Sequence, residues 1–334
     1  MLIRKELRIA VVGLGKMGLL HASILNAMPT VSFTAACDKS TLMLRLYRKI
    51  FSRAGITVVD DLDRLRDFDL DVVYVTTPIS SHSYVAKRVY ALGIARNLFV
   101  EKTLASTYDQ ARDLCELARI QGGANMVGYM KRFNVVFGKA KELLLQESLG
   151  ALSSFKAYAY SSDFVGDGRT SKAPASRGGA LMDVGCHVVD LALWLFGDLQ
   201  VLSVKQQAQT GIGSERALSF GAVNPDGLEG EFDISQCMEN YRMPEMGISI
   251  LGSKGKMEVN DDRLLLKLSD GKSSTWYRHD LNDRVDFWLG EAEYYREDKH
   301  FVDSVLEKHD CEPSFYTASK VDCLIDQVRQ RGEP

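Results

Sequence analysis

A glycine-rich turn close to the N-terminus restricts the fold of this chain more than any other feature. Gly13, Gly15 and Gly18 directly follow an apolar, strand-like run at residues 8–12 and open a helical pattern at residues 15–28. In that position the first glycine makes a tight turn, the second lets the backbone approach a pyrophosphate, and the third lets helix and strand pack closely. The N–H groups at the helix N-terminus then face the phosphates. The triplet alone is a weak signal, but between a strand and a helix it predicts a dinucleotide-binding unit.

Strand and helix patterns alternate along the first part of the chain. After residue 28, strand-like runs occur at 31–37, 56–59, 71–76, 97–100 and 125–127, and helical patterns occur at 40–53, 81–92 and 107–121. The strands are apolar along their length, which indicates burial on both faces. Such strands in alternation with helices predict an α/β fold with a doubly wound parallel sheet.

The pattern changes after residue 128. A helical pattern at 134–146 is followed by alternating polar and apolar residues at 152–160, a polar loop at 161–177 and an apolar helix at 178–197. A β-rich stretch with hairpin turns follows at 199–277, and two further helical patterns lie at 292–308 and 314–330. These elements predict an α+β domain built on a mostly antiparallel sheet. For a chain of 334 residues we expect two domains, one for dinucleotide binding at residues 1–128 and a second at residues 129–334.

The composition argues against several classes of protein. The net charge of −3, with 46% hydrophobic and 25% charged residues, indicates an ordinary globular protein without a nucleic-acid or membrane partner. No apolar run is long enough to span a bilayer, and we expect no signal peptide. The six cysteines are scattered without a C-x-x-C pair, which predicts reduced thiols, a cytoplasmic location and no metal site.

A carboxylate at the end of the second strand indicates which dinucleotide binds. Asp38 lies about 20 residues beyond Gly18, where a carboxylate usually holds the ribose hydroxyls. Its charge would repel a 2′-phosphate, so we expect NAD rather than NADP, although Lys39 weakens this preference. A solvated aspartate beside a flexible turn is the alternative. The segment Thr76-Thr77-Pro78 ends another strand at the ligand-binding edge of such a sheet, and it either lines the nicotinamide ribose or forms an ordinary turn.

The apolar helix at residues 178–197 carries an unusual pair of polar residues. Asp183 and His187 are four residues apart, so in an α-helix their side chains meet on one face, and Asp190 lies one turn beyond His187. A carboxylate beside a histidine in an apolar helix is costly unless it has a function, which suggests an acid–base centre. The alternative is a core histidine whose hydrogen bonds are satisfied by a neighbouring carboxylate.

Several motifs occur in an order that resembles a known family. They are Gly13-x-Gly15-x-x-Gly18-x-x-His21, Thr77-Pro78 with His82, Glu101-Lys102, Gly128-Tyr129-x-x-Arg132-Phe133-Asn134, and Gly178-Gly179-Ala180-Leu181-x-Asp183-x-Gly185-x-His187-x-x-Asp190. Together they resemble the Gfo/Idh/MocA oxidoreductases, which include glucose-fructose oxidoreductase and inositol dehydrogenase. The resemblance covers essentially the whole chain and is densest at residues 8–197.

The resemblance implies a Rossmann domain followed by an α+β domain with a large, mostly antiparallel open sheet, through which family members often form homodimers or homotetramers. It implies hydride transfer between NAD(P) and a hydroxyl or keto carbon of a sugar, nucleotide sugar or inositol-like polyol. In an alternative within the family, tightly held NAD serves a redox-neutral epimerase or glycosidase. A different alternative is a non-catalytic NAD-binding regulatory protein, but such a protein has no need of Lys102, Asp183 and His187.

The resemblance also assigns roles to particular residues. The catalytic lysine of the family's E-K-P motif corresponds to Lys102, and its Asp–His pair corresponds to Asp183 and His187. A histidine titrates near neutral pH, so we assign His187 as the general base, with Asp183 orienting its ring. The ammonium of Lys102 would hydrogen-bond the substrate oxygen and stabilise developing charge. A solvated lysine paired with Glu101 is the alternative.

These motifs define the set of candidate residues. The candidate cofactor-binding residues are Gly13, Gly15, Lys16, Met17, Gly18, Asp38, Thr76, Thr77, Pro78, His82, Glu101 and Lys102, and the candidate substrate contacts are Arg132, Asp190 and the loop cations Arg169, Lys172 and Arg177. For Arg132 the alternative is an inter-domain salt bridge, and for Asp190 it is a carboxylate on the helix face that pairs with a basic neighbour. For the loop cations it is simple solvation, and for His82 it is a capping or packing role.

Two departures from the family's pattern affect these expectations. Thr103 replaces the proline that follows the catalytic lysine, and in the family that peptide bond is often cis, so the local turn is open to question. The loop at residues 172–177 lacks the Trp-Arg pair of many relatives, so we expect altered substrate recognition there.

Overall fold

The computed structural model describes residues 6–51, 55–163, 178–207 and 215–332. The chain folds into two compact units, one formed by residues 1–129 with 285–322 and the other by residues 130–284 with 323–334. The second of these segments, 285–322, was expected in the second domain but belongs to the first unit. It does so because helix α8 (Ala292–Glu307) packs against α1 (Lys16–Ala27). Helical periodicity predicts a helix but not which distant element it covers.

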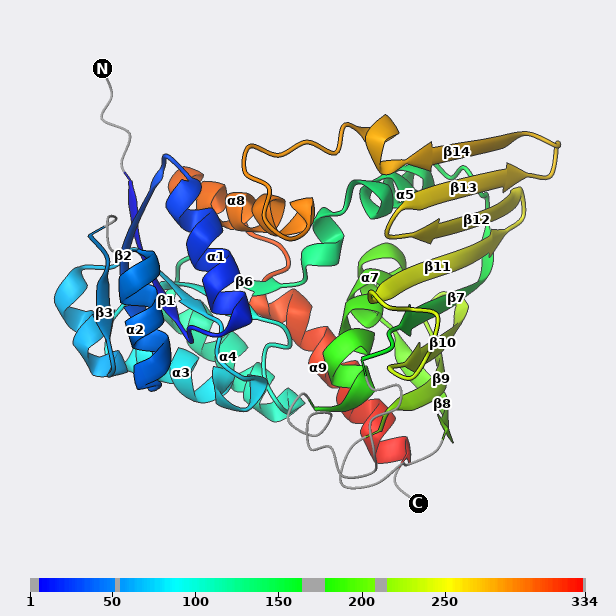
Figure 1. The fold of residues 1–334 in the computed structure, drawn as a ribbon. Coiled ribbons are helices and arrows are strands. Elements are labelled where there is room, and N and C mark those ends of the chain that lie inside the picture. Colours follow the sequence, from blue (N-terminus) through cyan, green and yellow to red (C-terminus); the bar gives the residue numbers. More distant parts are fainter. Residues whose placement is uncertain (1–5, 52–54, 164–177, 208–214, 333–334) are drawn as a thin grey trace. The chain divides into compact units, whose positions relative to one another are not determined.

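The first unit contains a six-stranded parallel sheet (Figure 1). Its strands are β1 (Leu7–Val12), β2 (Val31–Cys37), β3 (Thr57–Val59), β4 (Val72–Val75), β5 (Asn97–Glu101) and β6 (Asn125–Gly128). They are ordered β3-β2-β1-β4-β5-β6 with parallel neighbours, which confirms the predicted doubly wound sheet. The strand order reverses between β1 and β4, and ligands of such folds bind at the carboxyl ends of the strands beside this point.

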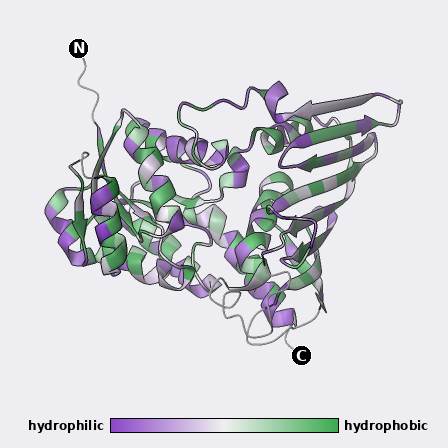
Figure 2. Ribbon diagram, in the orientation of Figure 1, coloured by the Kyte–Doolittle hydropathy of each residue, from purple (hydrophilic) through white to green (hydrophobic). Residues whose placement is uncertain are grey.

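The helices of the first unit are amphipathic. Besides α1 and α8 they are α2 (Thr41–Ile50), α3 (Ile79–Ala91) and α4 (Tyr108–Gln121), with a 3₁₀ segment at Leu62–Phe68. Figure 2 shows hydrophilic and hydrophobic residues alternating along their ribbons. This pattern is expected for helices that cover a sheet on one side and face solvent on the other. The strands beneath them are almost entirely buried, because parallel strands are covered on both faces.

The second unit contains an eight-stranded sheet with the order β14-β13-β12-β11-β7-β10-β9-β8. Its strands are β7 (Leu152–Tyr160), β8 (Gln200–Gln207), β9 (Ala217–Val223), β10 (Glu229–Ser235), β11 (Glu245–Gly252), β12 (Gly255–Asn260), β13 (Arg263–Leu268) and β14 (Ser273–Tyr277), and its helices are α5 (Val135–Leu145) and α7 (Cys186–Phe196). Helix α9 (Phe315–Gly332) passes from the first unit into the second. Strands β7 and β10 pair in parallel and the other recorded pairs of this sheet are antiparallel, which confirms the predicted mostly antiparallel sheet.

One face of the eight-stranded sheet is apolar. Across the register Phe155 pairs with Ile250, Ile250 pairs with Met257, and Met257 pairs with Leu266. All four side chains are buried. Helix α5 packs on β12 and β13, and helix α7 packs on β7 and β11. The helix that carries the predicted acid–base pair is therefore anchored on a hydrophobic surface.

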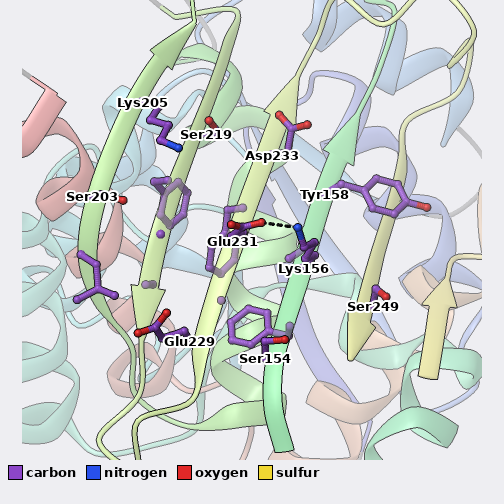
Figure 3. A pocket seen from close by; sticks show the side chains of 18 of the residues that line it. Ser154, Lys156, Tyr158, Ser203, Lys205, Ser219, Glu229, Glu231, Asp233 and Ser249 are labelled. Atoms are coloured by element: carbon purple, nitrogen blue, oxygen red, sulfur yellow. Dashed lines mark ion pairs between the residues drawn. The ribbon is translucent and has the colours of Figure 1, made fainter. Parts of the chain in front are cut away.

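The opposite face of this sheet is polar and exposed. Lys156 and Glu231 form an ion pair there with Nζ and Oε2 2.7 Å apart, and their side chains are 74% and 72% exposed (Figure 3). The Tyr160 hydroxyl donates a hydrogen bond to Asp233 over 2.6 Å. These side chains line a shallow hollow of about 680 Å³ over β7, β8, β9 and β10. None of the described helices is both long and apolar enough to cross a lipid bilayer.

Candidate functional site

The three glycines of the N-terminal motif meet different surroundings. Gly13 has a φ of +97°, and a Cβ there would lie 2.6 Å from the Thr77 backbone nitrogen. A Cβ on Gly18 would overlap the carbonyl oxygen of Gly13. At Gly15, by contrast, an added Cβ would meet no atom within 4 Å. The first and third glycines are therefore needed for packing, whereas the second leaves open space, as a pyrophosphate requires.

The start of α1 suits an anion. Gly15 is the N-cap and provides no side-chain hydrogen bond, and the first turn has no acidic residue. Lys16 and Met17, both predicted to contact the cofactor, lie in this first turn. The positive end of the helix dipole and its N–H groups therefore remain available for a phosphate.

Asp38 is fixed at the end of β2 by backbone donors. Its Oδ2 accepts a hydrogen bond from Leu14 N and its Oδ1 accepts one from Ser40 N, each over 2.7 Å. The carboxylate thus contacts the glycine turn itself. Because each carboxylate oxygen has a second lone pair, Asp38 retains acceptor capacity for ribose hydroxyls. These residues fit an NAD molecule as the sequence predicts.

Thr76 and Thr77 follow β4 beside the same turn. The Thr76 hydroxyl donates to the carbonyl oxygen of Gly13 over 2.6 Å, which ties the two strand ends together. The Thr77 hydroxyl is buried and has no hydrogen-bond partner within the residues that the structure describes. A buried hydroxyl without a partner is costly, and a bound ligand would satisfy it. Pro78 is the N-cap of α3.

His82 links two loops at the ligand-binding edge. Its ring is buried, with Nδ1 2.8 Å from the carbonyl oxygen of Thr103 and Nε2 2.7 Å from that of Thr77. Burial lowers the pKa of His82, although both carbonyls oppose that shift. The ring thus bridges the segments after β4 and β5, which agrees with the packing role left open in the sequence.

Lys102 lies directly after β5, and its side chain is half-buried. Its backbone N–H donates to Oε2 of Glu101 over 3.0 Å. The peptide bond between Lys102 and Thr103 is cis, although Thr103 replaces the family's proline. The Thr103 hydroxyl is buried and donates to the carbonyl oxygen of Ala105.

Glu101, which the sequence predicts to contact the cofactor, has a carboxylate that contacts His21 and the backbone of Lys102. Its side chain is buried, with Oε1 2.9 Å from Nε2 of His21 and Oε2 bonded to the Lys102 backbone. The other nitrogen of His21 faces Asp298, which comes from α8. Sequence reasoning missed Asp298, because 277 residues separate it from His21.

Asp183 lies in a π-helical turn, Leu181–Gly185, that precedes α7. The sequence predicts a continuous α-helix, but hydrogen bonds in a π-helix run from residue i to i+5, so α-helical periodicity does not hold here. The Asp183 Oδ2 accepts a hydrogen bond from Nε2 of Gln236 over 2.8 Å. Gln236 is fully buried just beyond β10, and nothing in the sequence singles it out. A Cβ on Gly185 would lie 2.6 Å from Ile234, so that glycine lets the turn approach β10.

His187 is in the first turn of α7 and is 9% exposed. The remaining residues of this helix are mostly apolar and buried, so a titratable ring here is an exception. Asp183 and His187 belong to the second unit, and Lys102 belongs to the first. No group of His, Cys, Asp and Glu residues in the described ranges is arranged to hold a metal ion.

Arg132 and Asp190, both predicted substrate contacts, pair with each other. Arg132 donates from Nε to Oδ2 over 2.8 Å and from Nη2 to Oδ1 over 2.6 Å. The side chains are 6% and 0% exposed. Such a bidentate pair favours the alternative of a basic partner for Asp190. Because both residues belong to the second unit, the pair is not the inter-domain salt bridge considered for Arg132. The other predicted substrate contacts, Arg169, Lys172 and Arg177, lie outside the described residues.

The buried Arg132–Asp190 pair predicts that one substitution destabilises the fold strongly and that a second substitution, at the partner, recovers most of the loss. Arg132→Met leaves the Asp190 charge buried without its counter-ion, so we expect the free energy of unfolding to fall by about 3–5 kcal/mol. The double variant Arg132→Met/Asp190→Leu should recover most of that loss, because it removes both charges. Denaturant unfolding measures both. As a matched control, Arg64→Met breaks the exposed pair of Arg64 and Asp60 and should cost at most about 1 kcal/mol. An unchanged stability of the single variant would contradict this account.

The glycine turn predicts opposite behaviour for two alanine substitutions. Gly15→Ala adds a methyl group to open space, so the fold should lose at most about 1 kcal/mol while NADH affinity falls at least about tenfold. Gly18→Ala should lower stability by about 1–3 kcal/mol as well as NADH affinity, because its methyl group displaces the helix from the strand. Urea unfolding and NADH fluorescence titration separate the two effects. Wild-type NADH affinity in Gly15→Ala would show that this position does not approach the pyrophosphate.

Comparison with known proteins matches both parts of the chain to one family. The Gfo/Idh/MocA oxidoreductase family, NAD-binding Rossmann fold, matches residues 7–129, and the Gfo/Idh/MocA C-terminal domain matches residues 137–258. D-glucoside 3-dehydrogenase of Escherichia coli strain K12 is 27% identical over 222 residues, which are 66% of this chain and 62% of that protein. The scyllo-inositol 2-dehydrogenase (NAD(+)) of Bacillus subtilis strain 168 is 25% identical over 200 residues, 58% of this chain and 54% of that protein. The matches thus span less than two thirds of these relatives.

A solved structure extends the likeness of fold to nearly the whole chain. Levoglucosan dehydrogenase in complex with NADH and levoglucosan superimposes with a TM-score of 0.84 and 19% identity, over 98% of this chain and 97% of that one. Residues 7–129 therefore form an NAD-binding Rossmann domain. With both of its domains matched, the chain belongs to the Gfo/Idh/MocA family of oxidoreductases.

Proposed function

We propose that this chain is an NAD-dependent dehydrogenase or reductase that acts on a secondary alcohol or the corresponding ketone of a sugar, nucleotide sugar or inositol-like polyol. The observation that carries the proposal is His187, a buried titratable ring in the mostly apolar helix α7, preceded by Asp183 in the π-helical turn, in a chain with an NAD-binding domain. Titratable groups at costly positions usually serve chemistry.

The proposed roles divide proton handling from hydride transfer. NAD, which the glycine turn and Asp38 would hold, would supply the hydride acceptor for the alcohol. His187 takes the hydroxyl proton as general base, because its ordinary pKa lies near neutral pH. Asp183, held by Gln236, orients the histidine ring. The ammonium of Lys102 hydrogen-bonds the same oxygen and stabilises its developing negative charge.

The proposed substrate class rests on the relatives. The names D-glucoside 3-dehydrogenase, scyllo-inositol 2-dehydrogenase and levoglucosan dehydrogenase each denote oxidation of a cyclic polyol. A ring carbinol is therefore the substrate group that we propose. For the cofactor we propose NAD in preference to NADP, because Asp38, fixed by Leu14 and Ser40, places a negative charge where a 2′-phosphate would lie.

This function predicts that two single substitutions strongly reduce turnover without loss of cofactor binding. We expect net NADH formation from NAD with at least one of scyllo-inositol, levoglucosan and methyl D-glucoside, and less NADPH formation from NADP. His187→Ala and Lys102→Ala should each lower kcat by about 10²–10³-fold with NADH affinity nearly unchanged, because they remove proton transfer and charge stabilisation. The matched controls His279→Ala and Lys87→Ala replace exposed side chains and should behave as wild type.

The outcomes of this assay separate the alternatives. Product without net NADH, with NAD copurifying, would favour the redox-neutral epimerase or glycosidase. No turnover across a wider panel of sugars, inositols and nucleotide sugars, with NADH affinity intact, would favour a non-catalytic NAD-binding protein. Wild-type turnover in Lys102→Ala or His187→Ala would contradict the proposed roles.

We further propose that the polar face of the eight-stranded sheet joins copies of the chain into a homodimer or homotetramer. The support is the exposed, shallow face around Lys156 and Glu231, together with the family's habit of associating through this sheet. Its mixed charges and tyrosines suit a self-complementary contact.

Native mass spectrometry tests this association. We expect two or four times the 37.2 kDa of one chain. Ser249→Arg, in the centre of this face, should yield monomer, because it places an unpaired charge in the contact. Ser269→Arg, in an exposed turn, is the matched control and should leave the mass unchanged. A monomeric wild-type protein would contradict the proposal.

A further inference from the structure

His21 lies between two carboxylates in the interior of the first unit. Its Nδ1 is 2.8 Å from Oδ1 and 3.0 Å from Oδ2 of Asp298, and its Nε2 is 2.9 Å from Oε1 of Glu101. The His21 and Asp298 side chains are fully buried, and the Glu101 side chain is 8% exposed. A neutral imidazole has one N–H donor, whereas hydrogen bonds to two ionised carboxylates require an N–H donor at both ring nitrogens. The geometry therefore matches a doubly protonated ring.

The surroundings of the ring favour that charge. Tyr74 of β4, Phe99 of β5 and Tyr294 of α8 enclose it, with ring centroids 5.7, 5.1 and 6.2 Å away. Burial lowers the pKa of His21, but Asp298 and Glu101 outweigh it and hold that pKa well above the ordinary value.

The pKa values of the two carboxyl groups shift in opposite directions. Burial raises the pKa of Glu101, but the charges of His21 and Lys102 reverse the shift and leave it low. Burial also raises the pKa of Asp298, and His21 opposes that rise. Tyr74 and Tyr294, which also face this site, have pKa values raised by burial and remain neutral at physiological pH. The charge of Glu297, a buried carboxylate of α8, acts on both tyrosines.

Glu101 connects this buried group to the proposed active site. Its Oε1 accepts from His21, and its Oε2 accepts from the backbone N–H of Lys102 over 3.0 Å. One carboxylate therefore fixes both the end of β5 and the residue that we propose to contact the substrate oxygen. His21 itself stands on α1, the helix that begins at the glycine turn.

We propose that His21, as an imidazolium held by Asp298, is a positioning residue for Lys102, acting through the carboxylate of Glu101. The ring is buried and away from solvent, so it is not itself a catalytic residue. This role is separate from cofactor binding by the glycine motif, because that motif binds phosphates through backbone N–H groups at the start of α1. The effect on turnover rests on the proposed function of Lys102, whereas the protonation state of His21 does not.

The charge on His21 is tested directly in the wild-type protein. Histidine-selective ¹⁵N labelling and long-range ¹H–¹⁵N correlation distinguish an imidazolium from either neutral tautomer. We expect one ring, assigned by its absence in His21→Gln, to stay doubly protonated from pH 6 to pH 9. A neutral His21 ring at pH 8 would overturn the proposal, whether or not any substrate is known.

The pH dependence of turnover tests the positioning role. Because the partners raise the pKa of His21, its charge is present below that raised pKa and is lost only as pH climbs through it. Asp298→Asn removes one anion and keeps an acceptor oxygen, so it should bring this loss into the measurable range. We expect kcat of Asp298→Asn to fall with rising pH by at least about tenfold relative to wild type, with the ¹⁵N titration following the same curve. A kcat ratio that stays constant with pH would count against the role.

Substitution of His21 separates positioning from cofactor binding. On the best compound of the panel above, His21→Gln should lower kcat by about 10–100-fold and change the KM for NAD by less than about threefold. His309→Gln, the same substitution at an exposed site, is the matched control. A raised KM for NAD with unchanged kcat would overturn the proposal.

The two proposals fail in distinguishable ways. If Lys102→Ala keeps wild-type turnover, the proposed function of Lys102 fails. If Lys102→Ala loses turnover while folded His21→Gln keeps it, only the role of His21 fails. Should His21→Gln not fold, the signal of the His21 ring is assigned by its shift in Asp298→Asn, and the wild-type ¹⁵N titration and the pH profile of Asp298→Asn still decide.

Discussion

At the glycine turn of the first unit, pieces of backbone approach so closely that no side chain fits between them. The carbonyl of Gly13 lies so near Gly18 that a Cβ could not fit between them, and Gly13 in turn lies against the backbone of Thr77. These contacts bring β1, the start of α1 and the end of β4 to one point. The hydrogen bonds from Thr76 to Gly13 and from Leu14 to Asp38 hold the arrangement from both sides. Both hydrogen bonds and the open space at Gly15 depend on that approach of helix to strand, so the cofactor site depends on it too.

Buried ion pairs provide a second level of organisation. Exposed pairs such as Arg64–Asp60 contribute little to stability, because solvent screens them and ordering the side chains costs entropy. The pair Arg132–Asp190 and the group Glu101–His21–Asp298 are different, since their charges lie in the protein interior. Removing one partner there leaves a charge without compensation, so these groups fix specific geometries. Both the pair and the group contain residues of the family motifs, which are Arg132, Asp190, His21 and Glu101.

The sequence was most informative where the signal is local. The glycine spacing, Asp38 after β2 and the apolar strands predicted the doubly wound sheet, because turn chemistry and strand burial act within a few residues. The partners of the functional side chains were beyond such reasoning. Asp298 meets His21 across 277 residues and Gln236 meets Asp183 across 53, and both were ordinary polar residues in the sequence. The π-helical turn at Asp183 was also missed, since spacing arguments assume α-helical geometry, and the packing of α8 on α1 could not be read from periodicity.

We propose that this chain transfers a hydride between a ring carbinol and NAD. The most direct measurement follows the transferred hydrogen. The protein is incubated with NAD and a cyclic polyol that is deuterated at its carbinol carbons, and the mass of the recovered cofactor is measured by mass spectrometry. The account predicts NADH that carries one deuterium from the polyol carbon, formed in the wild-type protein and strongly reduced in His187→Ala. Recovered cofactor without deuterium, across a panel of sugars and inositols that the protein binds, would contradict it.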